Sequence, residues 1–334
     1  MTLQANSCVV DAAATQPSTP VRKDWTLKEA FGIDVPYSVS GFAQHDWAPV
    51  KDPNYKFNKE NLSDLLNFHA SGETAFLAVG HKGTGKTSMV EQFHASLCLP
   101  LLIVSCSRNM TEDQLVGQWL LTEDKSMNFK LTGVALAAQL GMSVLLEEYN
   151  LLPPGVASVL NQLLEGKPYD VPQTSERIIP APGFKVFATM NPNDGMNYRD
   201  REDLDSANED RFFIVQVGYL PEEDEIPIVE GALAAITDSE VRKNMAKGMV
   251  DVANKIRAQF MQTSAAALTT VMSTRTLRRW AKFSLIYRSA ASKGKSPLHV
   301  ALSKVLTNAP SVSAADRQAI HEIVVSVLDQ EYRV

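Results

Sequence analysis

The sequence is poor in cysteine, in long apolar stretches and in net charge, and each shortage excludes a class of protein. The three cysteines show no metal-binding spacing, and their odd number favours reduced thiols in a cytoplasmic protein: Cys8, Cys98 and Cys106. No apolar run reaches the roughly 18 residues that a transmembrane helix needs. The N-terminus also lacks the basic start and apolar stretch of a secretory signal. We therefore expect neither a disulfide-stapled nor a membrane-associated protein.

Charge and length set further bounds. The net charge of −6 does not suit broad non-specific binding to nucleic acid or to an anionic membrane, although a local basic groove is not excluded. A chain of 334 residues with 45% hydrophobic residues predicts about two globular domains. Such a chain can bury a full core without a disulfide or a structural metal.

Short apolar runs that alternate with helical patterns predict an α/β fold. Helices are expected over residues 58–70 and 86–97, and a third begins at Pro153. Five runs indicate a parallel sheet covered by helices on both faces, and they span residues 74–79, 101–105, 143–146, 185–189 and 212–217.

Two hairpins are predicted between these strands, over residues 119–131 and 167–180. Residues 25–57 contain several prolines and aromatics, and we expect them to run irregularly across a surface. After Pro221 the strand patterns largely stop and helical spacing continues. The predicted organisation is a mobile tail, an α/β domain with an N-terminal extension, and a small all-helical domain, at residues 1–22, 23–220 and 221–334.

The strongest motif runs from Gly80 to Thr87, follows a predicted strand and opens a predicted helix. It matches the G-x-x-x-x-G-K-[ST] pattern of phosphate-binding loops. Glycines let the backbone N–H groups turn toward phosphates, and the helix N-terminus adds positive potential. Lys86 is expected to contact the β- and γ-phosphates and Thr87 to ligate Mg²⁺. The predicted nucleotide-binding residues are Gly80, His81, Lys82, Gly83, Thr84, Gly85, Lys86 and Thr87, of which His81 and Lys82 are expected to be solvent-exposed.

An apolar strand that ends in two carboxylates predicts a site for Mg²⁺ and for water activation. Glu147 is expected to hold the metal directly or through a water, and Glu148 to orient the attacking water. Two acids at a strand end are common without any such role, so the pair gains its weight from the phosphate-binding loop.

Two more polar residues are expected at the site. Asn191 ends a buried strand, where its amide can hold the lytic water, although an Asn before Pro is by itself a turn signal. Arg211 precedes the fifth strand, and an arginine supplied by a neighbouring subunit can stabilise the transferring phosphoryl group. Taken alone, Arg211 predicts a surface salt bridge with Glu209 or Asp210. Alternatives to Arg211 are Arg199 and Arg201.

A basic segment begins a predicted helix of the second domain. Arg275 in this segment is expected to contact the γ-phosphate and so to couple nucleotide state to the angle between the domains. The plainer interpretation is a solvated basic helix face, which we apply to Arg278 and Arg279.

These motifs, in this order, resemble the AAA+ ATPases. More narrowly they are similar to the MoxR group, with the CobS-type ATPase subunit of cobaltochelatase as the nearest likeness. The likeness spans about residues 25–290 and rests on seven segments, at residues 31–34, 80–87, 113–117, 147–150, 187–191, 210–212 and 273–280.

The resemblance implies a P-loop NTPase core with a helical lid, in a usually hexameric ring that binds ATP and Mg²⁺ between subunits. It assigns Lys86 and Thr87 to Walker A, Glu147 and Glu148 to Walker B, Asn191 to sensor 1, Arg211 to the arginine finger and Arg275 to sensor 2. Whether Arg275 acts on its own nucleotide or a neighbour's is left open. Glu147 stands where the family usually has aspartate, which leaves the hydrolytic rate open. Relatives typically act with a partner that carries a von Willebrand factor A domain.

The expected function is Mg²⁺-dependent ATP hydrolysis that drives the remodelling of a protein client, whose identity the sequence does not give. Three alternatives stay open: a chelatase subunit, a nucleic-acid motor, and a nucleotide-locked scaffold without turnover. Basic hairpin tips would favour nucleic acid, but each predicted hairpin carries only two basic residues, Lys125 and Lys130 in one and Lys167 and Arg177 in the other.

Overall fold

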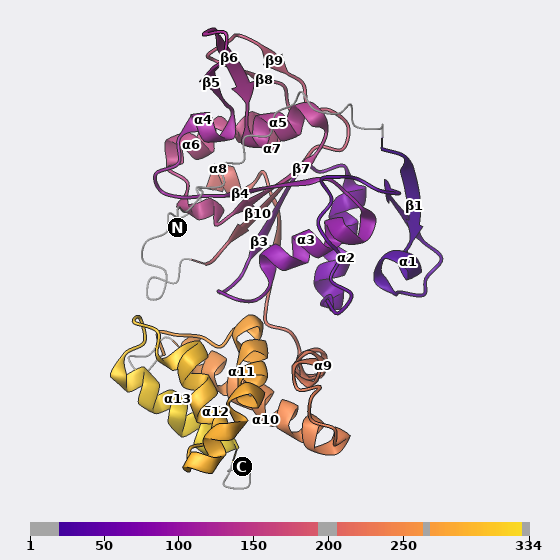
Figure 1. The fold of residues 1–334 in the computed structure, drawn as a ribbon. Helices are drawn as coiled ribbons and strands as arrows, with labels where there is room; N and C mark the ends of the chain where they lie inside the picture. The colour runs from indigo at the N-terminus through magenta and orange to yellow at the C-terminus, as the bar shows by residue number, and fades with distance from the viewer. Residues whose placement is uncertain (1–19, 193–205, 263–267, 329–334) are drawn as a thin grey trace.

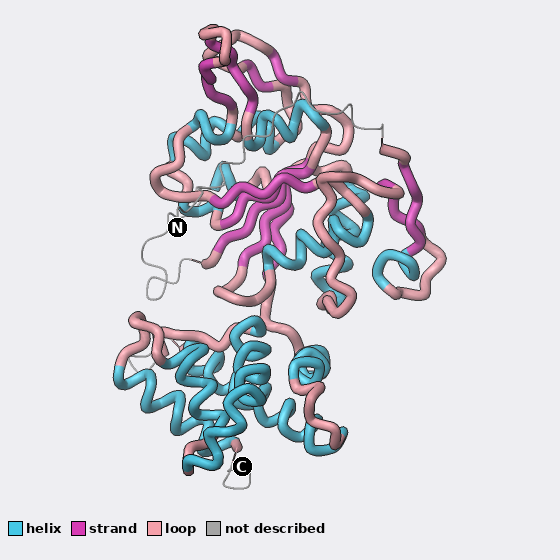
Figure 2. The backbone as a smooth tube through the Cα atoms, in the orientation of Figure 1, coloured by secondary structure: helices cyan, strands magenta, loops and turns pink. Residues whose placement is uncertain are grey.

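A computed structural model describes residues 20–192, 206–262 and 268–328. The part of the chain before α9 (Glu222–Ala232) is built on a five-stranded sheet in the order β11-β3-β10-β7-β4, which lies apart from the C-terminal helices (Figures 1 and 2). All the pairings of this sheet are parallel, so the carboxyl ends of its strands share one edge. The predicted parallel sheet is therefore confirmed, with strands β3 (Ala75–Val79), β4 (Leu101–Ser105), β7 (Ser143–Glu147), β10 (Lys185–Met190) and β11 (Phe213–Gln216).

Helices cover both faces of the sheet because alternate side chains of each strand point to opposite sides. Phe76, Leu145 and Phe187 share one buried cluster with α2 (Lys59–Ser71) and α3 (Lys86–Leu97). The intervening residues of the same strands, such as Leu77, belong to a second cluster. Its helices are α4 (Glu112–Leu115), α5 (Gly133–Leu140), α6 (Pro154–Val159) and α7 (Asn161–Leu164), with a 3₁₀ turn at Tyr149–Leu151 and α8 (Ser206–Glu209) nearby.

The N-terminal segment is more regular than expected. Strand β1 (Arg22–Thr26) pairs antiparallel with β2 (Ser38–Phe42), and α1 (Leu27–Phe31) lies between them. The prediction of irregular chain over residues 25–57 is wrong for this part. A capping box between Thr26 and Glu29 starts α1, and Gly32, with φ +73°, ends it in the left-handed conformation.

Both predicted hairpins are present and stand together at the end of the molecule away from the C-terminal helices (Figure 1). The first pairs β5 (Gly117–Leu121) with β6 (Met127–Leu131), and the second pairs β8 (Tyr169–Asp170) with β9 (Arg177–Ile178). In the first hairpin Trp119 lies opposite Phe129 with ring centroids 5.4 Å apart.

The C-terminal helices have their own buried cluster around Trp280, whose Nε1 donates to the Leu298 carbonyl over 2.9 Å. They are α9 (Glu222–Ala232), α10 (Ser239–Phe260), α11 (Thr274–Ile286), α12 (Pro297–Leu302) and α13 (Ala314–Val327), with a 3₁₀ turn at Tyr287–Lys293 and a π turn at Ser303–Thr307. In the described part of the chain, no helix is long and apolar enough to cross a membrane. The predicted tail up to residue 19, together with Arg199 and Arg201, lies outside the described residues.

Candidate nucleotide site

The loop between β3 and α3 has the backbone geometry of a phosphate cradle. Gly83 and Gly85 have φ of +81° and +90°, a region that favours glycine. A Cβ on Gly80 would lie 2.2 Å from the Val217 carbonyl oxygen, so no side chain fits there. Helix α3 begins at Lys86 with the glycine as its N-cap, and its first N–H groups face the loop rather than a side-chain cap.

Lys86 and Asn191 meet at the shared carboxyl edge of the sheet. The Lys86 Nζ donates to the Gly80 carbonyl over 2.7 Å, to the His81 carbonyl over 2.9 Å and to the Asn191 Oδ1 over 2.9 Å. Asn191 is buried directly after β10, and its carbonyl accepts a 3.0 Å hydrogen bond from the buried Asn150. Strand β10 lies between β3 and β7, so Asn191 stands between the loop and the acidic strand end.

The Glu147 carboxylate is fixed by two hydroxyl groups. Thr87 Oγ1 donates to one of its oxygens over 2.9 Å, and Ser105 Oγ donates to the other over 2.9 Å. Residues 87 and 147 are thus in direct contact, as a shared Mg²⁺ site requires. In the described residues no three His, Cys, Asp or Glu side chains gather as a complete metal site. Thr87 and Glu147 therefore fit a cation that takes its remaining ligands from phosphate and water, which is the usual mode for Mg²⁺.

Glu148 has an unusual backbone for its residue type. Its φ of +57° is left-handed, it is exposed, and its N–H donates to Thr189 Oγ1 over 3.3 Å. Such a conformation costs free energy and persists only when the surroundings enforce it. It turns the chain sharply between Glu147 and the buried Tyr149.

Burial, together with the negative charge at this edge, shifts the pKa of neighbouring groups. Burial, and then Glu147 and Glu148, raise the pKa of the Cys106 thiol to about 12. Burial and Glu147 raise the pKa of Glu91, whereas Arg275 opposes that rise. Arg275 therefore lies within electrostatic range of α3 of its own chain. It is exposed, as are Arg278 and Arg279.

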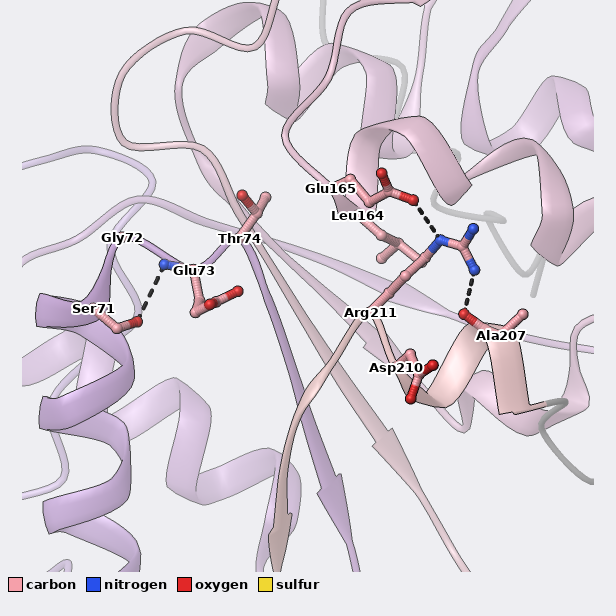
Figure 3. A pocket seen from close by; sticks show the side chains of 9 residues that line it. All are labelled: Ser71, Gly72, Glu73, Thr74, Leu164, Glu165, Ala207, Asp210 and Arg211. Atoms are coloured by element: carbon pink, nitrogen blue, oxygen red, sulfur yellow. Dashed lines mark hydrogen bonds and ion pairs between the residues drawn. The ribbon is translucent and has the colours of Figure 1, made fainter.

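Arg211 lies at the other end of the sheet, in a hollow of about 670 Å³ (Figure 3). Its Nε donates to Glu165 over 2.8 Å, and its Nη1 donates to the Ala207 carbonyl. The salt bridge expected from the local sequence thus exists, but its partner is Glu165 rather than Glu209 or Asp210. Because Arg211 precedes β11 and the loop follows β3, and these strands are parallel, the strand length separates Arg211 from its own loop.

The sequence analysis did not identify several residues that lie at the site. Ser105 and Glu91 approach Glu147 only through the fold, and no local pattern marks them. His81 was expected to be exposed, which is wrong. It is half-buried, and its ring packs edge-on against Phe260 with centroids 5.7 Å apart, whereas Lys82 is exposed as expected.

Comparisons with known proteins find family models and individual relatives that match this chain. A family model for the AAA domain (dynein-related subfamily) matches residues 75–212, and one for the CbbQ/NirQ/NorQ C-terminal region matches residues 233–327. The aerobic cobaltochelatase subunit CobS of a Sinorhizobium species is 30% identical over 277 residues, which are 80% of this chain and 82% of that protein. BssE of Thauera aromatica, named as a proposed chaperone, is 28% identical over 66% of this chain and 75% of its own. A solved structure of a proposed ATPase from Cytophaga hutchinsonii covers 80% of this chain and 88% of its own, at 17% identity and a TM-score of 0.43.

Proposed function

The chain belongs to the AAA+ ATPases of the MoxR type, close to CobS, and from this premise we propose that it hydrolyses ATP between the subunits of a ring in order to remodel a protein client. The observation that carries the proposal is the meeting of Lys86, Thr87, Glu147 and Asn191 at one edge of the sheet, beside a glycine loop built to face phosphate.

Each residue has a role that follows from its position. The loop N–H groups and Lys86 bind the phosphates, and Thr87 and Glu147 hold Mg²⁺. When bound, the cation supplies Lewis-acid stabilisation of the charge on the phosphate oxygens. Glu148 accepts a proton from the attacking water, and Asn191 orients that water. The left-handed backbone at Glu148 supports this division, because it turns the chain directly after the proposed metal ligand Glu147.

The two arginines act on different nucleotides, one bound by the same chain and one bound by a neighbouring subunit. Arg275, within electrostatic range of Glu91 on α3, acts on the nucleotide of its own chain. Arg211 is separated from its own loop by the length of β11, which supports an action on the neighbouring subunit's nucleotide. A ring with the site at each interface, usually a hexamer in this group, satisfies both assignments.

The first hairpin is the proposed client contact. Trp119, Leu121 and Met127 occupy one face of it and are 48%, 69% and 55% exposed, so they offer an apolar patch to a partly unfolded protein. The second domain, which we place after residue 220, moves as the lid. A partner with a von Willebrand factor A domain is part of this proposal, in line with the MoxR resemblance.

A chelatase role is the second candidate, supported by the match to 82% of the CobS length. A nucleic-acid motor has less support. Two of the four basic hairpin residues are paired with carboxylates, since Arg177 binds Asp170 through two nitrogens at 2.7 and 2.9 Å and Lys167 binds Glu165.

Glu148→Gln tests the proposal. This variant is expected to bind ATP with unchanged affinity and to lose Mg²⁺-dependent turnover by roughly 100-fold or more, because the water has no base. Phosphate release and equilibrium ATP binding are measured on the same preparation, with Glu322→Gln on α13 as the matched control. If Glu148→Gln turns over ATP at the wild-type rate, or if the wild type shows no Mg²⁺-dependent turnover, the proposed function is wrong.

A further inference from the structure

Tyr219 lies in the segment that joins β11 to α9, between the sheet and the C-terminal helices (Figure 1). Its hydroxyl donates to the Lys82 carbonyl of the phosphate-binding loop over 3.0 Å. Its ring lies under the Arg257 guanidinium, whose central carbon is 4.4 Å from the ring centroid. One half-buried side chain thus contacts the nucleotide loop at one end and a helix of the lid along its face.

Arg257 is held in place by a buried ion pair. Its two terminal nitrogens donate to the two carboxylate oxygens of Glu225 on α9, each over 2.7 Å, and both side chains are almost fully buried at 2% and 0% exposure. A bidentate pair of this kind has a fixed geometry, and the cost of desolvating it makes a free-energy gain alone a weak reason for its presence. Positioning is the role that its geometry fits.

The Arg257–Glu225 pair also forms hydrogen bonds with the start of α11. Thr274 Oγ1 donates to Glu225 Oε1 over 2.6 Å, and Arg257 Nε donates to the Met272 carbonyl over 2.8 Å. Arg275 is the next residue along the helix. In addition, Ser273 packs so closely on the loop that a Cβ at Gly83 would lie 2.1 Å from its own Cβ.

We propose that Tyr219 is a positioning residue for nucleotide binding, at one end of a relay formed by Tyr219, Arg257, Glu225 and Thr274. The relay connects the loop carbonyl of Lys82 to the first turn of α11. The positions of the phosphate-binding loop and of Arg275 are therefore fixed relative to each other. This inference rests on the proposed function, because it assumes that the loop binds ATP.

Peptide geometry explains how the hydroxyl acts on the cradle. The described residues contain no cis peptide bond, so the Lys82 carbonyl and the Gly83 N–H of the same peptide point in opposite directions. When Tyr219 holds the carbonyl, the N–H is directed to the other side of the loop. Glycine on one side of this bond would otherwise let the peptide rotate readily.

Tyr219→Phe removes the hydroxyl and keeps the ring on Arg257. Its dissociation constant for N-methylanthraniloyl-ATP, measured by fluorescence, is expected to rise roughly five-fold, the factor equivalent to a hydrogen bond of ~1 kcal/mol. In ATPase assays the KM is expected to rise with it while kcat stays within about two-fold. A purely structural defect would instead lower the active fraction and kcat, and leave the KM unchanged.

The matched control is Tyr287→Phe, an equivalent change in the lid at a ring that stacks on Phe283. Its affinity is expected to match the wild type. If Tyr219→Phe also binds as the wild type does, the inference is wrong. If the wild type itself binds no nucleotide, the proposed function has failed instead, so the two failures are distinguishable.

A double-mutant cycle tests the relay as a unit. Thr274→Val removes the hydroxyl contact to Glu225 without touching Tyr219. The double variant is expected to bind more tightly than the product of the two single effects predicts, by about two-fold or more. Each change breaks one link of the same relay, at the Lys82 carbonyl or at Glu225, so the second change has less coupling left to remove. Strictly multiplicative effects would show that Tyr219 and Thr274 act independently, and would overturn the relay.

Discussion

Glu147 is a residue whose length matters to the site. It is one methylene longer than aspartate, and this extra length would let the carboxylate swing. The hydroxyls of Thr87 and Ser105, each 2.9 Å from one carboxylate oxygen, prevent that. Glutamate in place of aspartate at position 147 is therefore compatible with a defined metal position. Ser105 is the side chain that holds one oxygen of the longer acid.

Ser105→Ala is expected to weaken the metal site selectively. The freed carboxylate oxygen makes Glu147 less well oriented, so the Mg²⁺ concentration for half-maximal ATPase activity rises roughly three- to ten-fold. A magnesium titration at saturating ATP measures this, and kcat at high Mg²⁺ stays near the wild-type value. Ser158→Ala on α6 is the control, since its hydroxyl bonds only locally to the Gly155 carbonyl. Equal Mg²⁺ requirements in all three proteins would contradict the assignment.

The predicted residues that meet at the carboxyl edge of the sheet are those whose position follows from a strand end. Asn191 directly follows β10, Glu147 ends β7, and Lys86 follows the loop after β3. Parallel strands bring such residues to one edge. Ser105 follows the same rule but carries no charge or spacing that would single it out. Tyr219 and Glu91 reach the site through packing between helices and domains, which one-dimensional periodicity does not encode.

At the scale of elements, α3 connects the nucleotide loop to the core. His94 on this helix is fully buried, its Nδ1 donates to the Val90 carbonyl over 2.7 Å, and its ring meets Phe187 of β10 edge-on at 4.7 Å. Burial lowers the pKa of His94 to about 4, so the ring is neutral in the folded protein at neutral pH.

The stability of the chain is expected to fall in mild acid because of this histidine. The pKa of His94 is lowered on folding, so below about pH 6.5 the unfolded chain binds a proton that the folded chain does not bind. The free energy of unfolding then drops progressively from about pH 6.5 to about pH 4, by at most ~3 kcal/mol from this residue. Urea unfolding at pH 7 and pH 5 measures the loss, which His94→Leu is expected to reduce. The same pH dependence in the variant and the wild type would refute the role of His94.

Elements differed in how well the sequence predicted them. The buried parallel strands were found because each is a short, continuous apolar run. The β1–α1–β2 unit was missed because apolar and polar residues alternate in its strands, and the two strands are defined by their pairing with each other. The local signals for α1, the Thr26–Glu29 capping box and Gly32, were present and could have located it. The predicted helix from Pro153 is divided at Leu160 into α6 and α7.

At the scale of the whole molecule, the two halves of the proposed active site lie at opposite ends of the sheet. The loop and the acidic residues occupy the carboxyl edge, and Arg211 occupies the amino edge beside Glu165. In the function we propose, a single chain does not close this site, and a closed head-to-tail ring would bring each Arg211 to the next subunit's loop. The sequence alone gave the resemblance to ring-forming ATPases, but the separation of the two halves is a property of the folded chain.

Mixing two inactive variants tests this arrangement most directly. Lys86→Ala removes nucleotide binding and retains Arg211, while Arg211→Ala retains the nucleotide site and lacks the arginine. Each alone is expected to fall at least about 100-fold in ATPase activity. In co-assembled 1:1 rings, purified through two different tags, about a quarter of the interfaces join an intact nucleotide site to an intact arginine, and activity returns in that proportion. Activity no greater than that of the separate variants would contradict a site shared between subunits.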